Sequence, residues 1–366
     1  MEPIADTAQH PLHPARDGAG RLLLTRHAEV VAAAVDPTLF SSAVSAHLQV
    51  PNGLDGDGHA AVRRALDPFF APDALAPLVA QLARVAGELV ARQSAHDAHF
   101  DAVADLGARF AVRGQALWLG WPEAIDDILL QWVADSRAAA RGGDRTALAA
   151  AAERFDAIVR GILDDRRATP ARDDVTGRLM AVRLDGGRRF TDAELVSVLR
   201  NWTGGDLSSL ALCAGVIVHW LAAHPDEQRA LAEAPDEELD AAIDEILRID
   251  DPFVSNRRVA TRDTVVGGCP VAAGEHVVLH WRHANRDPDA VPEPTVFRPA
   301  ANAAANLVWG IGPHACPGRP LATAELRVLV RALLRAGTII PEGEAVREIA
   351  PVAGFRTVPV RIVPHG

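Results

Sequence analysis

Lysine and tyrosine are absent from this sequence, and only three of its 366 residues are cysteine. Arginine alone supplies the 37 basic side chains other than histidine, a bias that we attribute to GC-rich coding and not to function. The net charge of −11 argues against general binding of nucleic acid. Cys213, Cys269 and Cys316 form no C-x-x-C pair and are odd in number, so neither a zinc site nor a disulfide framework is indicated. Free thiols indicate a reducing compartment, and we expect a cytoplasmic protein.

A secretory signal and an obvious membrane anchor are also lacking. Residues 1–20 are polar and contain proline and glycine, which fits neither an anchor nor the apolar centre of a signal peptide. The stretch Leu207–Ala223 is apolar, but it is short for a membrane span and carries Ser208, Ser209 and His219. It therefore predicts a buried helix, and no membrane partner is expected.

Apolar residues are abundant, at 49%, beside 23% charged residues, which is enough to build a large folded core. The length alone suggests two domains. Thr191 and Glu194 form a capping box that opens a long apolar helix ending near His224, about 45–50 Å long at roughly 1.5 Å per residue. Short strand-like runs occur at 22–24, 259–278 and 339–363. We predict a mainly α fold with a small β region.

The segment from Trp309 to Gly318 places one cysteine, Cys316, on a glycine-rich loop ahead of a helix. Gly310, Gly312 and Gly318 allow backbone angles and close approaches that side chains would block. Taken alone, a single cysteine is more often a small buried residue of the core. The glycine spacing favours a second interpretation, a thiolate that must stay deprotonated and bind a metal.

The helix after the cysteine is predicted to start at Pro317, because the first helical position tolerates a missing N–H. Apolar residues then recur at helical spacing up to a stop at Gly337. Cys316 would lie at the positive end of the helix dipole, near free backbone N–H groups, and both favour the thiolate.

These residues resemble the haem-ligand loop of the cytochrome P450 superfamily, which reads F-x-x-G-x-x-x-C-x-G. Trp309 stands in place of the phenylalanine, and Gly312, Cys316 and Gly318 match. The resemblance implies a P450-like fold in which residues 1–366 form a single haem-thiolate monooxygenase domain. It also implies that Cys316 is the metal ligand, the proximal thiolate of haem b (iron protoporphyrin IX), and that Gly318 contacts the cofactor.

Four basic side chains match residues that meet the haem propionates in this family. His59 and Arg63 correspond to its H-x-x-x-R motif, after a turn that here reads Asp55-Gly56-Asp57-Gly58. Arg258 corresponds to a strand arginine, and His314 to a residue two positions before the ligand. Charge-assisted hydrogen bonds to carboxylates are strong, so the resemblance implies a cationic clamp. Without it, His59 and Arg63 would be interpreted as a solvated helix edge.

Glu245 and Arg248 are one helical turn apart, which by itself indicates an ordinary surface ion pair worth roughly 0.2–0.5 kcal/mol. They match the E-x-x-R pair of the family, which implies a buried, structural pair. Arg298 is the nearest candidate for a third, basic partner. Asn285-Arg286-Asp287-Pro288 matches a turn common in the family.

The oxygen-activating helix is where the sequence departs from the family, in which an acid is followed directly by threonine. In one alignment with the family pattern Leu207 falls at the acid position, and in the alignment shifted by one residue it falls at the alcohol position. We expect Asp206 with Ser209, which share a helix face, or Ser208 with water, to relay protons. The alternative is that both serines hydrogen-bond back to their own helix. Gly205 would let the helix pass close to the haem.

On the substrate side, the segment Ala43–Gly58 is shorter than the loop that family members usually place over the active site, which favours an open pocket. Candidate lining residues are Leu48, Val50, Trp202 and 253–255. No reductase segment is recognisable, so we expect electrons to come from separate proteins.

The predicted function is a haem-thiolate monooxygenase that inserts one atom of O2 into a small or medium apolar substrate. Its electrons would come from a ferredoxin-type partner and a reductase, and Arg319 and Arg327 are candidates to meet an acidic ferredoxin. Two alternatives stay open. One is a hydrogen-peroxide-dependent peroxygenase or decarboxylase on the same fold, favoured by the interrupted acid–alcohol pair. The other is a haem-binding sensor without catalysis.

Overall fold

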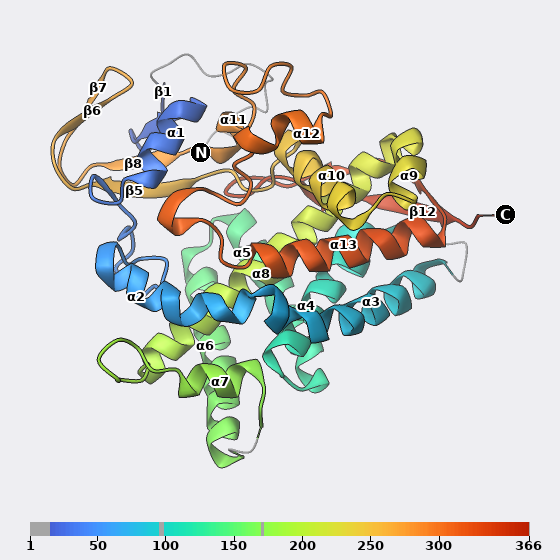
Figure 1. Cartoon of the computed structure of the whole chain (residues 1–366), viewed down its shortest axis with the longest axis horizontal. Coiled ribbons are helices and arrows are strands. Elements are labelled where there is room, and N and C mark those ends of the chain that lie inside the picture. The colour runs from blue at the N-terminus through green and yellow to red at the C-terminus, as the bar shows by residue number, and fades with distance from the viewer. Residues whose placement is uncertain (1–14, 95–98, 170–171, 366) are drawn as a thin grey trace. The chain divides into compact units, whose positions relative to one another are not determined.

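The computed structural model describes residues 15–94, 99–169 and 172–365. Within these ranges the chain forms two compact units, each built from separate stretches of sequence. The first unit takes the residues up to Arg63, then Ala241–Pro317 and Ile349–Ala353; the second takes Arg64–Asp240, Gly318–Glu348 and the residues from Gly354 onward. Figure 1 shows the chain and labels most of the helices and some of the strands.

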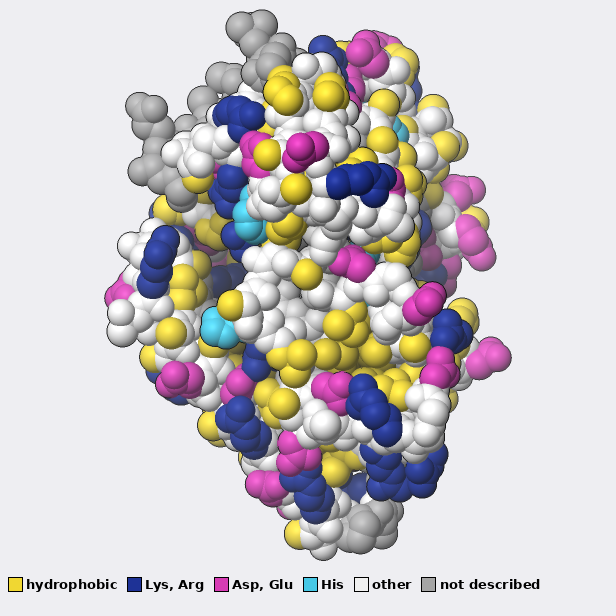
Figure 2. Space-filling view, turned by 90° about the vertical axis from the view of Figure 1, so that its left-hand side faces the viewer, with side chains coloured by type: hydrophobic (Ala, Val, Ile, Leu, Met, Phe, Trp, Pro, Cys, Tyr) yellow, Lys and Arg dark blue, Asp and Glu magenta, His cyan; other side chains and the backbone are white. Residues whose placement is uncertain are grey.

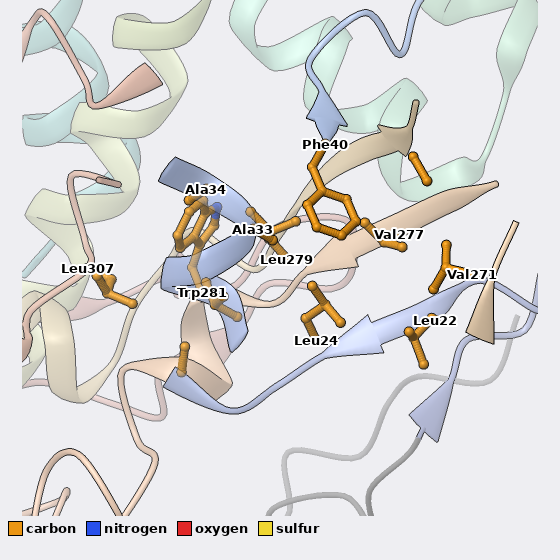
Figure 3. Close-up of a cluster of buried hydrophobic side chains, with 13 residues drawn as sticks. Leu22, Leu24, Ala33, Ala34, Phe40, Val271, Val277, Leu279, Trp281 and Leu307 are labelled. Carbon is orange, nitrogen blue, oxygen red and sulfur yellow. The ribbon is translucent and has the colours of Figure 1, made fainter. Parts of the chain in front are cut away.

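A five-stranded sheet organises the first unit. Leu22, Leu23 and Leu24 of its second strand are all buried, as expected for a strand covered on both faces. Helix α1 (His27–Val35) packs on this sheet, and Figure 3 shows its alanines beside Phe40, Leu279 and Trp281. The strand order is β1 (Ala15–Arg16), β2 (Leu22–Leu24), β8 (His276–Leu279), β5 (Asn256–Ala260) and β3 (Phe40–Ser41), with β2 and β8 parallel and the other neighbours antiparallel.

The rest of the first unit consists of short elements and loops. Helices α2 (Gly56–Leu66) and α10 (Asp236–Ile249) each contain a boundary between the units. The short elements are β6 (Thr264–Val266), β7 (Cys269–Val271), α11 (Trp281–Ala284), α12 (Pro299–Asn302), η4 (Ala303–Ala305) and η5 (Gly312–His314).

The long helix α8 (Asp192–Ala223) is the centre of the second unit. Thr191 and Glu194 form the predicted capping box at its start, and its C-cap is His224. Buried apolar side chains occupy all sides of the helix, which is typical of a core helix. By length and composition alone α8 and α3 (Pro72–Ser94) could each cross a membrane, but most of α8 is buried within the protein.

The other helices of the second unit pack around α8 and α3. Helices α4 (Ala108–Leu119) and α13 (Arg319–Ala336) both contact α8, and α13 lies along α3 (Figure 1). The remaining helices are η1 (Asp67–Phe70), η2 (Ala102–Gly107), η3 (Glu123–Ile125), α5 (Asp126–Gly142), α6 (Arg145–Ala168), α7 (Val175–Ala181) and α9 (Pro225–Ala232). The strands form the sheet β4 (Phe100–Asp101), β12 (Pro359–Val363), β9 (Thr338–Pro341) and the pair β10 (Val346–Arg347), β11 (Phe355–Thr357).

The prediction of a mainly α fold with a small β region is confirmed, and so is the long buried helix. The predicted start of the helix after the cysteine is wrong. That helix, α13, begins at Arg319 with Gly318 as its N-cap and Pro320 in its first turn, so Pro317 lies before it. Gly318 has a φ of −78°, which any residue can adopt, so the expected need for glycine at this position does not arise from its backbone angle.

The Glu245–Arg248 pair is buried in the first unit, as the resemblance implied. The two side chains are 2% and 0% exposed, and the guanidinium donates to both carboxylate oxygens at 2.7 and 2.9 Å. Arg248 also donates to the carbonyls of Asn285 and Pro294. One buried cation therefore joins α10 to two later segments of the chain.

The third partner of this pair is not the side chain that was expected. Glu245 accepts hydrogen bonds from the backbone N–H of Arg298 and from the side-chain amide of Asn302, at 3.0 and 2.7 Å. The Arg298 guanidinium instead pairs with Glu293 on the surface. Burial alone would raise the pKa of Glu245. These hydrogen bonds and those from Arg248 outweigh that effect and hold the pKa below its usual value.

Replacing Arg248 with methionine should lower the free energy of unfolding by about 3–5 kcal/mol, because it leaves the Glu245 carboxylate buried without its cation. The matched control is Arg229, which pairs with Asp226 at the same i,i+3 spacing but with both side chains mostly exposed. Arg229→Met should cost less than about 1 kcal/mol. Urea unfolding of both variants makes the comparison, and equal losses would contradict the role assigned to burial.

Candidate functional site

Cys316 lies on a loop whose backbone is held within the first unit. The Cys316 N–H donates to the Trp309 carbonyl at 2.8 Å, and the Trp309 indole donates to Asp244 Oδ1 at 2.7 Å. Gly310 and Gly312 have φ of 68° and 75°, in the region that favours glycine, and a Cβ on Gly312 would lie 3.0 Å from a backbone oxygen of α1. The Cys316 side chain is exposed. The loop therefore presents a thiol from a fixed backbone.

The helix dipole contributes less to the thiolate than the sequence suggested. Because α13 begins at Arg319, Cys316 lies outside its first turn, and the effect of the dipole falls off within that distance. A thiolate at Cys316 would therefore depend on the loop more than on the helix dipole.

A second set of hydrogen bonds holds the segment that leads into this loop. The buried side chain of Asn285 donates to Asp251 Oδ2 and accepts from the Leu307 N–H, both at 2.7 Å. Burial raises the pKa of Asp251 to about 7, which hydrogen bonds from Phe253 and Asn285 only partly offset. The match of Asn285 to a family turn did not indicate this role, because its partners are 34 and 22 residues away along the chain.

The first unit brings together the four basic side chains predicted to hold the propionates. The rings of His59 and His314 have centroids 4.1 Å apart, and Arg63 donates to the carbonyls on either side of His314 at 3.0 Å. His314 Nε2 lies 3.2 Å from Asp55 Oδ1. Arg258 is close enough for its charge to act on both His314 and Asp55. Of the four residues, His314 is two positions before Cys316 and shares its loop.

Burial and neighbouring charges shift the pKa values of two side chains in this cluster. Burial, with the nearby charge of Arg258, lowers the pKa of His314 despite its contact with Asp55. Burial also lowers the pKa of Arg258, which nevertheless stays charged. Arg63 and Arg258 therefore supply two guanidinium groups, the donors best suited to bind carboxylates.

In the second unit, α8 carries the predicted oxygen-activating residues. One carboxylate oxygen of Asp206, Oδ2, is buried without a hydrogen-bond partner, and burial raises the pKa of this group from 3.8 to about 7. Across the described part of the chain no hydrogen bond joins Asp206 to Ser208 or Ser209, and the Ser208 carbonyl accepts from Arg137 of α5 at 2.8 Å. No described atom lies within 4 Å of a Cβ built on Gly205, so the helix is open at that point. The proton relay stays a prediction.

Two residues expected to line the substrate pocket belong to the core instead. Trp202 packs against Trp118, Phe69 and Phe70, with ring centroids 5.0–5.5 Å apart, and Val50 is 2% exposed. Apolar residues in the sequence carry no mark that separates core from pocket, because both environments select the same side chains.

Comparison with known proteins identifies the family. A sequence model of the family Cytochrome P450 matches residues 141–360, more than half of the chain. The chain belongs to the cytochrome P450 family. Cyclomarin C epoxidase CymV from Salinispora arenicola is 30% identical over 351 residues, which cover 88% of this chain and 85% of that protein. Erythromycin C-12 hydroxylase from Saccharopolyspora erythraea is 29% identical, and the aligned region covers 92% of this chain and 87% of that protein.

Solved P450 structures share the fold. The open form of cytochrome P450 EryK from S. erythraea matches with a TM-score of 0.87 and 27% identity, over 96% of this chain and 93% of that one. This P450 is accordingly a monooxygenase, an oxidoreductase that binds protoporphyrin IX haem and uses O2, an organic substrate and redox partners. The match to bacterial P450 structures over nearly the whole chain indicates a soluble protein.

Asp206→Asn should stabilise the P450 at alkaline pH. The pKa of Asp206 is about 7 in the folded state and 3.8 when the group is exposed, so between these pH values the folded state holds a proton that the unfolded state has lost. The contribution of Asp206 to the free energy of unfolding is therefore lost as the pH rises from 3.8 to about 7. Asparagine removes this loss. Melting temperatures at about pH 5 and about pH 8 should show the variant gaining on the wild type at the higher pH. A difference that does not change with pH would contradict the raised pKa.

Proposed function

We propose that Cys316 is the proximal ligand of haem b and that His59, Arg63, Arg258 and His314 hold its propionates. The observation that carries the proposal is the assembly of these groups in one unit, with an exposed thiol on a fixed loop beside a cluster of guanidinium and imidazole groups. The donor set fits the cofactor, since thiolate is the haem ligand of P450 enzymes and arginine binds carboxylates.

Two glycines complete the proposed contacts with the cofactor. Gly205 leaves the surface of α8 open, which suits the approach of a flat ring, and Gly318 follows the proposed ligand by two residues. We propose further that residues 1–366 act as one haem-thiolate monooxygenase domain, because the matched relatives and structures run over both units.

The bound haem would supply the redox chemistry that activates O2. The chain's residues set the conditions for it. Cys316 would hold the haem as a thiolate that donates electron density, and Arg63 and Arg258 would neutralise the propionates. Asp206, with a pKa of about 7, exchanges a proton at Oδ2 near neutral pH, and Ser208 and Ser209 offer hydroxyl groups along the same helix. We propose that these three residues are the catalytic proton relay.

The substrate that we propose is a small or medium apolar organic molecule. Names among the matched relatives state the substrates epothilone C/D, cyclomarin C, erythromycin and a steroid, all of them organic molecules. A substrate panel should therefore begin with erythromycin, epothilone and a steroid.

We propose a ferredoxin-type partner with its reductase as the electron source, in the cytoplasm. Arg319, at the exposed start of α13, is a candidate contact for an acidic ferredoxin. Arg327 suits this role less than predicted, because its guanidinium already pairs with Asp240 at 2.6 Å and lies near Asp236.

The CO difference spectrum of the dithionite-reduced holoprotein tests the ligand. The wild type should show a strongly red-shifted Soret band, because the thiolate of Cys316 donates to the iron, and Cys316→Ala should lose it. Cys269→Ala is the matched control, since it removes a thiol outside the loop, and it should keep the band. A wild-type band at the position of histidine-ligated haem would refute the proposal.

Turnover with two oxidants tests the relay. Asp206→Asn should lower the rate of NADPH-driven turnover by roughly 10²-fold, because a positioned acid is lost, and should leave peroxide-driven turnover little changed. The missing hydrogen bond between Asp206 and either serine favours one alternative function, a peroxygenase. Wild-type turnover with peroxide alone would establish that alternative. Tight haem binding without turnover by either route would indicate a sensor.

A further inference from the structure

Two long side chains of helix α5 reach across to α8 in the second unit. The indole ring of Trp132 would lie 3.7 Å from a Cβ built on Gly204. Arg137, five residues further along α5, donates from Nη2 to the Ser208 carbonyl at 2.8 Å. Both contacts are made by the far ends of long side chains, so the two backbones lie apart at this point.

The stretch of α8 at these contacts is accessible, although α8 is the core helix of its unit. Gly205 is exposed, and Gly204, Ser208 and Ser209 are half-buried, whereas Leu207 between them is buried. Residues four apart lie above one another on a helix, so the accessible residues form a single stripe. An open stripe therefore interrupts the buried surface of α8 beside the guanidinium group.

The Arg137 guanidinium keeps most of its hydrogen-bonding capacity. In the described part of the protein its one acceptor is the Ser208 carbonyl, although the group carries five N–H donors. Its Nε and Nη1 are not among the buried atoms without a partner, so both border accessible space. A guanidinium whose planar fork is free can bind both oxygens of a carboxylate.

The protein does not supply that carboxylate among its described residues. Two acids, Glu348 and Asp101, act on Arg137 through their charge alone. Glu348 forms an ion pair with Arg141 at 3.0 Å, and Asp101 accepts hydrogen bonds from two backbone N–H groups. Burial lowers the pKa of Arg137, but a guanidinium stays charged at neutral pH. A partly buried cation without an ion pair has a desolvation cost that a bound anion would offset.

The other end of the gap between α5 and α8 is apolar. The Trp132 ring packs on Phe155 of α6 with ring centroids 4.5 Å apart, and its N–H donates to the Ala151 carbonyl at 2.8 Å. The indole therefore presents only carbon atoms to Gly204. A ligand that matches both ends has an apolar body and one anionic group.

We propose that Arg137 is a specificity-determining residue that binds a carboxylate of the substrate, and that the substrate is an organic acid with an apolar body. The inference rests on the proposed function and narrows it from an apolar molecule to an apolar acid. Ser208, whose carbonyl Arg137 contacts, belongs to the proposed proton relay. A carboxylate bound at Arg137 would therefore hold the apolar body beside that stretch of α8.

Calorimetric titration of the holoprotein with matched acids and esters tests this anchor. Decanoate and ibuprofen, each with its methyl ester, present the same apolar body with and without the charge. At about pH 8, where both acids are ionised, each acid should bind roughly ten- to a hundredfold more tightly than its ester, because a charge-assisted pair with arginine is gained. Equal affinities, or no binding of either acid, would overturn the proposal.

Variants of Arg137 identify the group that makes the difference. Arg137→Gln should abolish the preference for the acid and leave the affinity for the ester unchanged, and Arg137→Lys should restore part of it, because lysine keeps the charge without the fork. The matched control is Arg154→Gln, which removes an exposed arginine that pairs with Asp135 of α5 at 2.9 Å, and it should keep the preference. Equal weakening of acid and ester in Arg137→Gln would show that Arg137 only supports α8. The comparison in the wild type does not depend on the folding of any variant.

Product analysis separates this inference from the proposed function. With decanoate and dodecanoate the oxygen atom should enter at the same distance from the carboxylate, because the anchored end is fixed and the extra length lies beyond it. A constant distance from the methyl end instead would contradict the anchor. If the wild type oxidises no substrate, the proposed function fails, whereas the affinities for acid and ester still decide the role of Arg137.

Discussion

The first unit is held together by the buried guanidinium group of Arg248. It neutralises Glu245 and also donates to the Asn285 carbonyl, while the Asn285 side chain binds the Leu307 N–H ahead of the cysteine loop. The position of the Cys316 thiol is thereby set by a buried charge and a chain of hydrogen bonds. Hydrophobic packing alone would not achieve this, since it has no direction, whereas each of these bonds has a required geometry.

The absence of lysine has a structural counterpart. Arginine is the cation of the buried ion pairs described above, and its planar fork binds both oxygens of a carboxylate, as in the pair of Arg200 and Asp156 at 2.8 and 2.7 Å. On the face shown in Figure 2, basic and acidic side chains are interspersed. Arginine is therefore the residue that forms ion pairs with carboxylates both on the surface and in the interior.

The two units treat buried acids in opposite ways. In the first unit, Glu245 has a cation and two further donors, which keep its pKa low and its position fixed. In the second, Asp206 and Glu325 have no cation among the described residues, and their pKa values rise. The first arrangement suits a scaffold. The second suits proton exchange at Asp206, because its pKa of about 7 lies near the working pH.

The amino-acid sequence was enough to predict the fold class, the long helix from its capping box, and the loop of Cys316, from its glycines, as the proposed haem-ligand loop. These are local patterns, and local backbone preferences decide them. The folded structure was needed to show that Trp202 belongs to the core, that the Arg298 side chain pairs away from Glu245, and that the charge of Asp206 acts on Glu325. Each of these depends on burial or on partners distant along the chain, and no short segment of sequence records which distant residues will exclude water from it.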